Sequence, residues 1–113
     1  MAIVEIVPSL IAEIESTFKK QGVEVLEYIK TLEQNPKKGK FIGTVGGVVI
    51  KELKYDNFRF YFITDGFKLT CSDSKDLVDL LLSVVRMSNK KNQQKVIDEI
   101  KRVLVVIGPM GFK

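Results

Sequence analysis

One stretch of sequence decides the fold: residues 47–71 read GVVIKELKYDNFRFYFITDGFKLTC. β-branched and aromatic residues alternate with charged ones on both sides of Asp56-Asn57, and a second turn pair follows at Asp65-Gly66. Alternation with a period of two is typical of half-buried strands, and such residue pairs are typical of tight turns. The stretch therefore predicts an antiparallel meander.

The turn at Asp56-Asn57 also predicts which residues face each other. With a two-residue loop there, the expected cross-strand pairs are Tyr55 with Phe58, Lys54 with Arg59, Leu53 with Phe60, Glu52 with Tyr61, and Lys51 with Phe62. Alternation then gives a core face of Leu53, Phe58, Phe60 and Phe62, and an outer face of Glu52, Lys54, Arg59 and Tyr61. Lys51 falls on the core face in this register, so either its ammonium snorkels out at the sheet edge or a bulge changes its direction.

The first third of the chain predicts a strand followed by a helical hairpin. Residues 2–7 are short, β-branched and roughly alternating, which indicates a strand that Pro8 closes. Apolar residues recur at helical spacing after Ser9, the expected cap of the first helix. Gly22 interrupts this helix, and a second apolar stripe runs to the turn signal Asn35-Pro36.

The last third completes an α+β pattern. Residues 74–87 fit a capped helix or a buried strand, and we favour a strand at about 80–87. A final helix is expected from about Lys90 to Leu104, with one apolar face. This order of elements predicts an N-terminal strand and helical hairpin, a mainly antiparallel four- to five-stranded sheet and a C-terminal helix. We expect the helices on one side of the sheet and a free face on the other.

Composition limits the class of protein. The chain has 113 residues, 45% of them hydrophobic, which predicts one domain over residues 1–113. It has no His and a lone Cys71, so we expect no disulfide, no metal site and no cofactor. Gly43, Gly46 and Gly47 match no nucleotide-binding fingerprint and indicate a turn. No stretch reaches the roughly 18 apolar residues of a membrane span, and the amino terminus lacks a secretory pattern, so we expect a cytoplasmic protein.

Positive charge gathers in the later part of the chain. Residues 1–33 hold six acids and three bases, a balance of −3, whereas residues 34–113 hold eight acids and fifteen bases, a balance of +7. The sum is the net charge of +4. Such an excess attracts polyanions such as nucleic acid, although a solvated lysine-rich surface is the alternative interpretation.

The predicted outer face offers groups that suit a phosphate. Arg59 can grip a phosphate through two bonds, Lys54 adds a point charge, and Tyr61 offers a stacking surface or a proton donor. Two cations directly opposite each other are unfavourable unless an anion lies between them. A second basic cluster lies where the last helix begins, and consists of Arg86, Lys90 and Lys91. An ordinary solvated sheet face is the alternative.

Four segments of the chain occur in a recognisable order. They are VEIVPSL before the helical hairpin, NPKKGKFIGTVGG, VIKELKYDNFRFYFI, and VVRMSNKKNQQKVIDEIKRVL. In this order they resemble the RelE/ParE toxin superfamily, and most closely its HigB-like, phage-derived branch. The resemblance spans nearly the whole chain, and its most specific parts are KELKYDNFRFYF and RMSNKKNQQKVI.

The resemblance implies a RelE-like fold and a toxin that cuts mRNA in the ribosomal A site. By position, the basic residues of the RNA-cutting members match Lys51, Lys54, Arg59 and Arg86. The basic cluster before the last helix adds Lys90 and Lys91 as expected RNA-binding residues. A ribose 2′-hydroxyl would attack the neighbouring phosphate, Arg59 and Arg86 would stabilise the transition state, and Lys54 would position the phosphate. Many active relatives have a late His or Tyr as general acid. This sequence has neither after Tyr61, which leaves Glu52 or Tyr61 for proton transfer.

The same resemblance leaves other functions and several partners open. Members similar to ParE inhibit DNA gyrase and cut no RNA, and an inactive nucleic-acid-binding relative is a further alternative. A toxin of this kind implies a cognate antitoxin protein, the ribosome and mRNA as partners, and no membrane. The apolar tail from Val105 to Phe112 could join the antitoxin interface or a homodimer.

Overall fold

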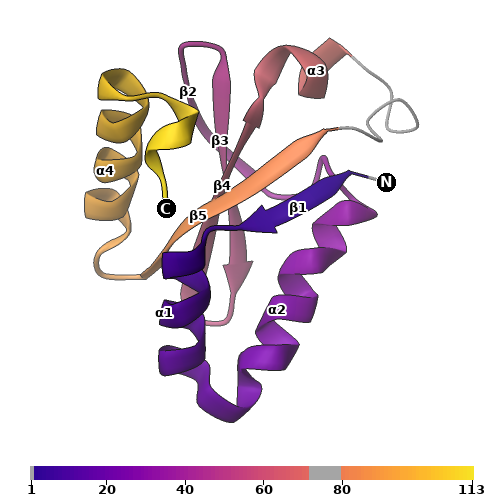
Figure 1. The fold of residues 1–113 in the computed structure, drawn as a ribbon, viewed down its shortest axis with the longest axis vertical. Helices are drawn as coiled ribbons and strands as arrows, with labels where there is room; N and C mark the ends of the chain where they lie inside the picture. The colour runs from indigo at the N-terminus through magenta and orange to yellow at the C-terminus, as the bar shows by residue number, and fades with distance from the viewer. Residues whose placement is uncertain (1, 72–79) are drawn as a thin grey trace.

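The computed structural model describes residues 2–71 and 80–113 and shows an α+β fold (Figure 1). Five strands form one mixed sheet in the order β1-β5-β4-β3-β2, with β1 parallel to β5 and the other neighbours antiparallel. The strands are β1 (Ile3–Ile6), β2 (Lys40–Val45), β3 (Val48–Tyr55), β4 (Phe58–Asp65) and β5 (Leu81–Asn89). The helices are α1 (Pro8–Phe18), α2 (Gly22–Lys30), α3 (Gly66–Cys71) and α4 (Gln93–Val106), with short 3₁₀ turns at Lys19–Gln21, Thr31–Glu33 and Pro109–Gly111. The predicted α+β class is confirmed.

The first face of the sheet packs against the helical hairpin α1–α2. Its core holds Leu53, Phe60 and Phe62 from β3 and β4, all nearly inaccessible to solvent. The helices contribute apolar side chains at helical spacing, namely Leu10, Ile14, Val25, Ile29 and Leu32. This burial of alternating strand residues is the main favourable term that holds the hairpin to the sheet.

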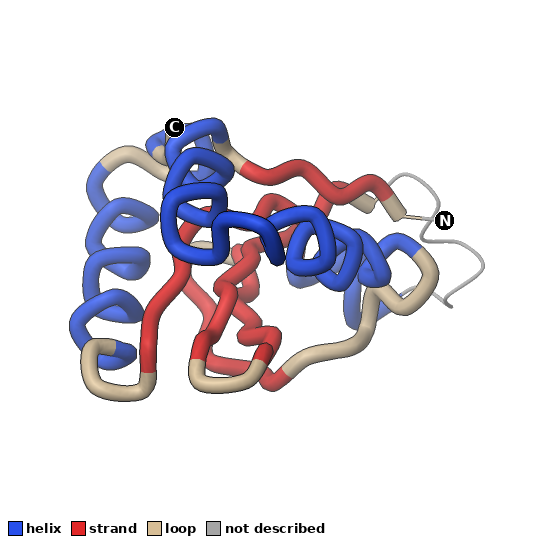
Figure 2. The backbone as a smooth tube through the Cα atoms, turned by 90° about the horizontal axis from the view of Figure 1, so that it is seen from below, coloured by secondary structure: helices blue, strands red, loops and turns tan. Residues whose placement is uncertain are grey.

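The second face is not free, contrary to the sequence-based expectation. Helix α4 and the C-terminal segment cover part of it, and Figure 2 shows helices on both sides of the strands. Ile97 and Ile100 of α4 pack there in a second core with Ile50 and Tyr61. The expectation was wrong because the alternation in β3 and β4 also places apolar residues such as Ile63 on this face, and the apolar stripe of α4 needs a surface to cover.

The hairpin between β3 and β4 has the predicted register. Each of the five predicted pairs from Tyr55 with Phe58 to Lys51 with Phe62 is present, and the ladder continues to Val48 with Asp65. Asp56 adopts the left-handed conformation, with φ of 55°, that such a tight loop requires. Gly46 and Gly47 form the β2–β3 turn with positive φ, as expected, whereas Gly43 lies in β2 at a bulge.

Asp65-Gly66 is not a hairpin turn but the start of helix α3, which corrects the second turn of the predicted meander. The Asp65 carboxylate accepts a hydrogen bond from the backbone N–H of Lys68 at 3.0 Å, as a helix cap does. The N–H of Gly66 donates to the carbonyl of Gly47 at 2.9 Å. A Cβ at Gly66 would lie 2.8 Å from that same oxygen, so only glycine fits this close approach.

The predicted ends of the helices also need correction. Ser9 does not cap α1, because Pro8 already occupies its first turn and the Ser9 hydroxyl donates instead to the carbonyl of Lys113. Helix α4 begins at Gln93 rather than Lys90, because the Asn89 side chain accepts hydrogen bonds from the N–H groups of Lys91 and Asn92 and closes a turn first.

Strand β5 confirms the preference for a strand at 80–87, and the remainder of the ambiguous 74–87 stretch, residues 74–79, lies outside the described residues. Among the helices of the described residues, none has the length and apolar content that a membrane crossing requires.

Candidate nucleic-acid interface

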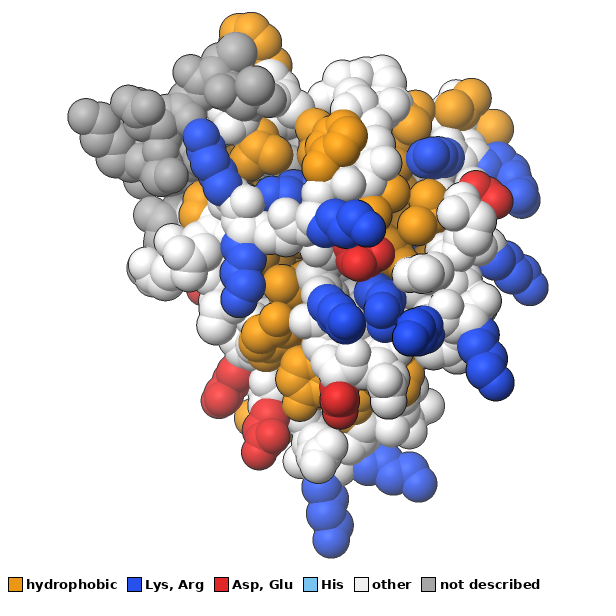
Figure 3. Space-filling model, turned by 180° about the vertical axis from the view of Figure 1, so that it is seen from behind, with side chains coloured by type: hydrophobic (Ala, Val, Ile, Leu, Met, Phe, Trp, Pro, Cys, Tyr) orange, Lys and Arg blue, Asp and Glu red, His pale blue; other side chains and the backbone are white. Residues whose placement is uncertain are grey.

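Basic residues lie side by side on the second face of the sheet, near the β3–β4 loop. Lys54 is directly opposite Arg59, and Lys40 of β2 is directly opposite Glu52. Side chains of directly opposed residues start about 4.5–5.5 Å apart at Cβ. We call Lys40, Glu52, Lys54 and Arg59 the cationic strip. Figure 3 shows Lys and Arg side chains gathered around an acidic side chain in the middle of one face of the molecule.

Arg59 is the most unusual member of the cationic strip. Only 8% of its surface is exposed, and its Nε and Nη1 atoms are buried without a hydrogen-bond partner. A buried guanidinium without a partner is unfavourable, because it has lost its water without gaining an acceptor. Lys54 across the ladder adds a second positive charge. Among the described residues, neither cation has a carboxylate within ion-pair distance.

Tyr61 lies on the second face, as predicted, but it is completely buried there. Its hydroxyl is 2.9 Å from the Ser88 hydroxyl, and either atom can donate. Burial raises the pKa of Tyr61 above its ordinary value of 10.0, and the Ser88 hydrogen bond opposes this shift. In this arrangement the ring offers no stacking surface. Its cross-strand partner Glu52 is only partly buried.

Arg86 makes its contacts within the protein. Its Nε lies 2.5 Å from a carboxylate oxygen of Glu99 in α4, and its Nη1 donates to the carbonyl of Val85 at 2.7 Å. The guanidinium also lies over the Phe112 ring, 5.0 Å from its centroid. Burial raises the pKa of Glu13 in α1, and the nearby Arg86 opposes this shift. Arg86 therefore connects β5 to α4 and to the C-terminal segment.

The two arginines are diagonal neighbours on the second face of the sheet. Arg59 is directly opposite Ser88, and Arg86 is directly opposite Tyr61, two positions further along the same ladder. They differ in their partners, because Arg86 is paired with Glu99 of α4, whereas the buried Nε and Nη1 atoms of Arg59 have no partner among the described residues. A phosphate held by both arginines would have to compete with Glu99 for Arg86.

Lys51 lies on the first face, as its register predicted, and only 6% of it is exposed. Lys51 keeps the direction that the register gives it, although the partner strand β2 has a bulge beside it, and its part-buried ammonium donates to the carbonyl of Lys37 at 2.6 Å. Burial lowers the pKa of Lys51, and the neighbouring Lys37 charge lowers it further. Lys51 is therefore on the wrong face to contact a ligand at the cationic strip.

Lys90 and Lys91 are exposed in the turn between β5 and α4. The turn begins next to Ser88, which is the cross-strand partner of Arg59, so it adjoins the cationic strip. The first turn of α4 has no side-chain cap, because the side-chain oxygen of Asn92 accepts from the backbone N–H of Asn89 instead. Free N–H groups at a helix start favour an anion nearby.

Two members of this surface were missed by sequence reasoning. Lys40 was not assigned because the pairing of β2 depends on a bulge between Phe41 and Gly43, which has no clear sequence signal. Ser88 was not assigned because its position depends on the register of β5. That register could not be predicted while residues 74–87 fitted either a helix or a strand. The alternation of the VVRMSN segment was the available signal for Ser88.

Comparison of the chain with protein-family models, curated proteins and solved structures gave no match. The described residues also contain no group of three or more His, Cys, Asp or Glu side chains placed to hold a metal ion.

Proposed function

We propose that this protein binds the backbone of RNA along the cationic strip and cleaves it, like the RNA-cutting toxins of the RelE/ParE superfamily that its sequence resembles. The observation that carries the proposal is Arg59, a residue 8% exposed whose buried Nε and Nη1 have no acceptor and which has a second cation directly opposite. A phosphate oxygen would supply the missing acceptor and neutralise both charges.

Binding follows from the arrangement of charges. One phosphate would bind between Lys54 and Arg59. Ser88 is directly opposite Arg59, and the turn that follows it and leads to α4 carries two more lysines, Lys90 and Lys91. A flexible single strand can place successive phosphates at both positions, because its backbone is not held in a helix. An anion reaches the Nε and Nη1 atoms of Arg59 only if a neighbouring side chain moves, since these two atoms are closed to solvent in the free protein.

Cleavage would use the 2′-hydroxyl of the bound ribose. Glu52 takes the proton from this hydroxyl, the oxygen attacks the adjacent phosphorus, and the bond to the 5′-oxygen breaks. The leaving 5′-oxygen takes a proton from water, and the products are a 2′,3′-cyclic phosphate and a 5′-hydroxyl. Arg59 stabilises the extra negative charge of the pentacoordinate transition state. Arg86 contributes by holding α4 in place rather than by touching the phosphate.

A second candidate function is binding without cleavage, as in the ParE-like inhibitors of DNA gyrase. It is favoured by two placements: Tyr61 is sealed under α4, and Arg86 is occupied by Glu99. A protein that binds its target without cleaving it needs no proton-transfer group at the surface. The burial of Tyr61 and the ion pair of Arg86 would therefore not impair its function.

Primer extension on mRNA translated by purified ribosomes distinguishes the two. We expect new 5′ ends with the natural protein, none with Arg59→Ala, and an unchanged pattern with Lys20→Ala, an exposed lysine near the far end of the helical hairpin. Intact message with folded natural protein would contradict the nuclease. Unchanged supercoiling by gyrase at excess protein would remove the second candidate.

A further inference from the structure

The last residues of β3 lie at an open edge of the sheet. The pairing of β2 with β3 ends at Lys40 with Glu52, whereas β3 continues to Tyr55 and pairs with β4 to its end. Because successive side chains of a strand point to opposite faces, Lys54 belongs to the second face and Tyr55 to the first. A strand of RNA at the cationic strip can therefore pass around this edge to the first face without crossing β2.

Two partly exposed tyrosines lie at this edge. The hydroxyl of Tyr28 in α2 donates to the backbone carbonyl of Lys54 at 2.8 Å, and this hydrogen bond is exposed to solvent. The ring centroids of Tyr28 and Tyr55 are 5.2 Å apart, and the Lys38 ammonium lies 5.1 Å from the Tyr28 centroid. We call Tyr28, Tyr55 and Lys38 the aromatic edge. Figure 3 shows apolar side chains at the surface beside the gathered Lys and Arg side chains.

The rings of the aromatic edge are held in place from behind. Phe18 of α1 meets Tyr55 edge-on, with 5.9 Å between the ring centroids, and it packs in the same way against Phe58, the cross-strand partner of Tyr55. All of these rings pack against the first core. Aromatic rings that are already fixed lose little conformational freedom when a flat ligand stacks on them. The two tyrosines therefore offer a preformed surface for a base.

We infer that an unpaired base of the bound RNA stacks on Tyr28 and Tyr55, while the cationic strip holds the adjacent phosphate and Lys38 supplies a cation for the next one. This inference rests on the proposed function and specifies its substrate as a single strand with accessible bases. Every base has a π-face, so stacking tolerates any sequence. In a double helix the bases stack on each other and present no free face to the rings.

Tyrosine fluorescence reports on this stacking, because the chain has three tyrosines and no tryptophan. A base that stacks on a tyrosine ring quenches its emission. We expect oligouridylate to quench the emission of the natural protein and also that of Tyr61→Phe, which removes only the buried tyrosine. An abasic strand of the same length should leave the emission unchanged. Unquenched emission at concentrations where oligouridylate is bound would overturn the inference.

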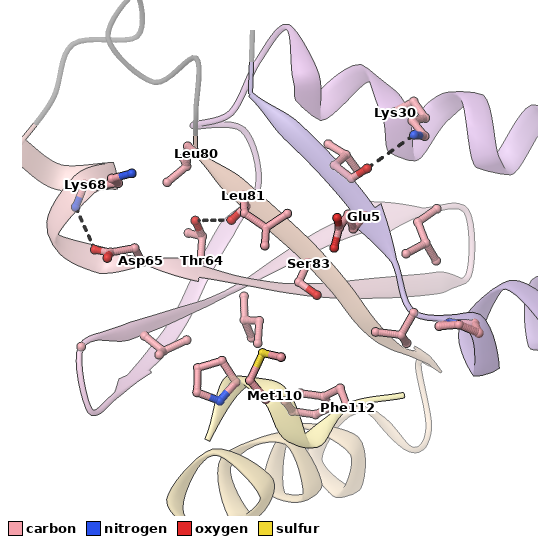
Figure 4. Close-up of a pocket in the computed structure, with 18 of the residues that line it drawn as sticks. Glu5, Lys30, Thr64, Asp65, Lys68, Leu80, Leu81, Ser83, Met110 and Phe112 are labelled. Carbon is pink, nitrogen blue, oxygen red and sulfur yellow. Dashed lines mark hydrogen bonds between the residues drawn. The ribbon is translucent and has the colours of Figure 1, made fainter. Parts of the chain in front are cut away.

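An exposed aromatic ring elsewhere serves as the matched control. Phe67 of α3 is 76% exposed and lines a groove of about 1160 Å³ that lies over β1 and the start of β5, next to Leu81 (Figure 4). The cationic strip adjoins the other end of β5, at Ser88. The groove does not select anions, because its lining carries charges of both signs, namely Glu5, Asp65, Lys30 and Lys68.

Affinity separates stacking from structural support. Tyr55→Leu should weaken the binding of oligouridylate about tenfold and leave the binding of the abasic strand within about twofold. Tyr55→Phe keeps the ring and should bind both strands as the natural protein does. Phe67→Leu should change neither affinity. Circular dichroism shows whether each variant is folded.

The two strands also distinguish a failure of this inference from a failure of the proposed function. An equal loss for both strands in Tyr55→Leu would overturn the inference, because the ring would then support the fold rather than a base. Equal affinity of the natural protein for both strands would overturn it as well and leave the proposed function standing. A natural protein that binds neither strand would remove the proposed function and the inference together.

Discussion

Lys54 and Arg59 lie directly opposite each other on adjacent strands, and no described carboxylate pairs with either. Such a pair is repulsive, and Arg59 is moreover buried with two unpartnered nitrogens. A fold selected only for stability gains nothing from this arrangement. We therefore interpret it as a feature retained for binding an anion, which leads to predictions that separate stability from binding.

Replacing Arg59 by an apolar side chain of similar length should not destabilise the protein. Arg59→Met removes a desolvated, unpartnered charge and keeps the stem that fills the interior, so we expect stability to rise by about 1 kcal/mol. Urea unfolding measures this change. Arg86→Met is the comparison, because it breaks the Glu99 ion pair and the Phe112 contact and should lower stability. A loss of stability in Arg59→Met would contradict this account of Arg59.

Lys51 should affect stability in a pH-dependent way. Burial lowers its pKa in the folded protein, so the unfolded chain holds this proton to higher pH than the folded chain does. The contribution of Lys51 to folding is therefore unfavourable at neutral pH and improves as pH rises through the folded pKa towards the ordinary value of 10.5. Lys51→Met should be more stable than the natural protein at neutral pH, and this advantage should shrink towards pH 10.5.

The measurement for Lys51 is the difference in unfolding free energy between the two proteins as a function of pH. The other lysines and tyrosines are common to the two proteins, so their contributions cancel in this difference. A stability advantage of Lys51→Met that grows with pH would contradict the prediction. RNA affinity should be the same for both proteins, since Lys51 faces the helical hairpin rather than the cationic strip.

The register of the β3–β4 hairpin could be predicted because its determinants are local. The Asp56-Asn57 loop and the alternation around it decide which residues share a face. The partner of Arg86 could not be predicted in the same way. Glu99 is thirteen residues away on another element, and their contact depends on how α4 docks on the sheet. Local patterns carry little information about docking.

The burial of Tyr61 was missed for a related reason. A tyrosine among charged residues on one strand face suggests an exposed position, but Tyr61 meets Ser88 across one ladder and the apolar stripe of α4 above it. An aromatic ring with a hydroxyl partner is readily buried. The strand register placed Tyr61 on the correct face of the sheet. Because this face was assumed to be open to solvent, Tyr61 was expected to be exposed, whereas it is buried.

Glu99 tests whether Arg86 acts through structure. Glu99 is about half exposed, so Glu99→Gln should lower stability by no more than about 1 kcal/mol, since solvent screens such a pair. Affinity for RNA should stay within about twofold, because the Val85 carbonyl and the Phe112 ring still hold the Arg86 guanidinium when Glu99 is neutral. Filter binding and urea unfolding on the same preparation measure both. A large gain in RNA affinity would show that Glu99 withholds Arg86 from the ligand.

The salt dependence of RNA binding tests the central claim most directly. Fluorescence anisotropy with a labelled single-stranded RNA gives the slope of log affinity against log salt concentration, and each phosphate contact contributes about 0.7 to this slope. Lys54→Ala and Arg59→Gln should each weaken binding and reduce the slope by about that amount, whereas Lys20→Ala should change neither. Equal slopes for all four proteins, with each variant folded, would contradict the cationic strip as the site that holds the RNA backbone.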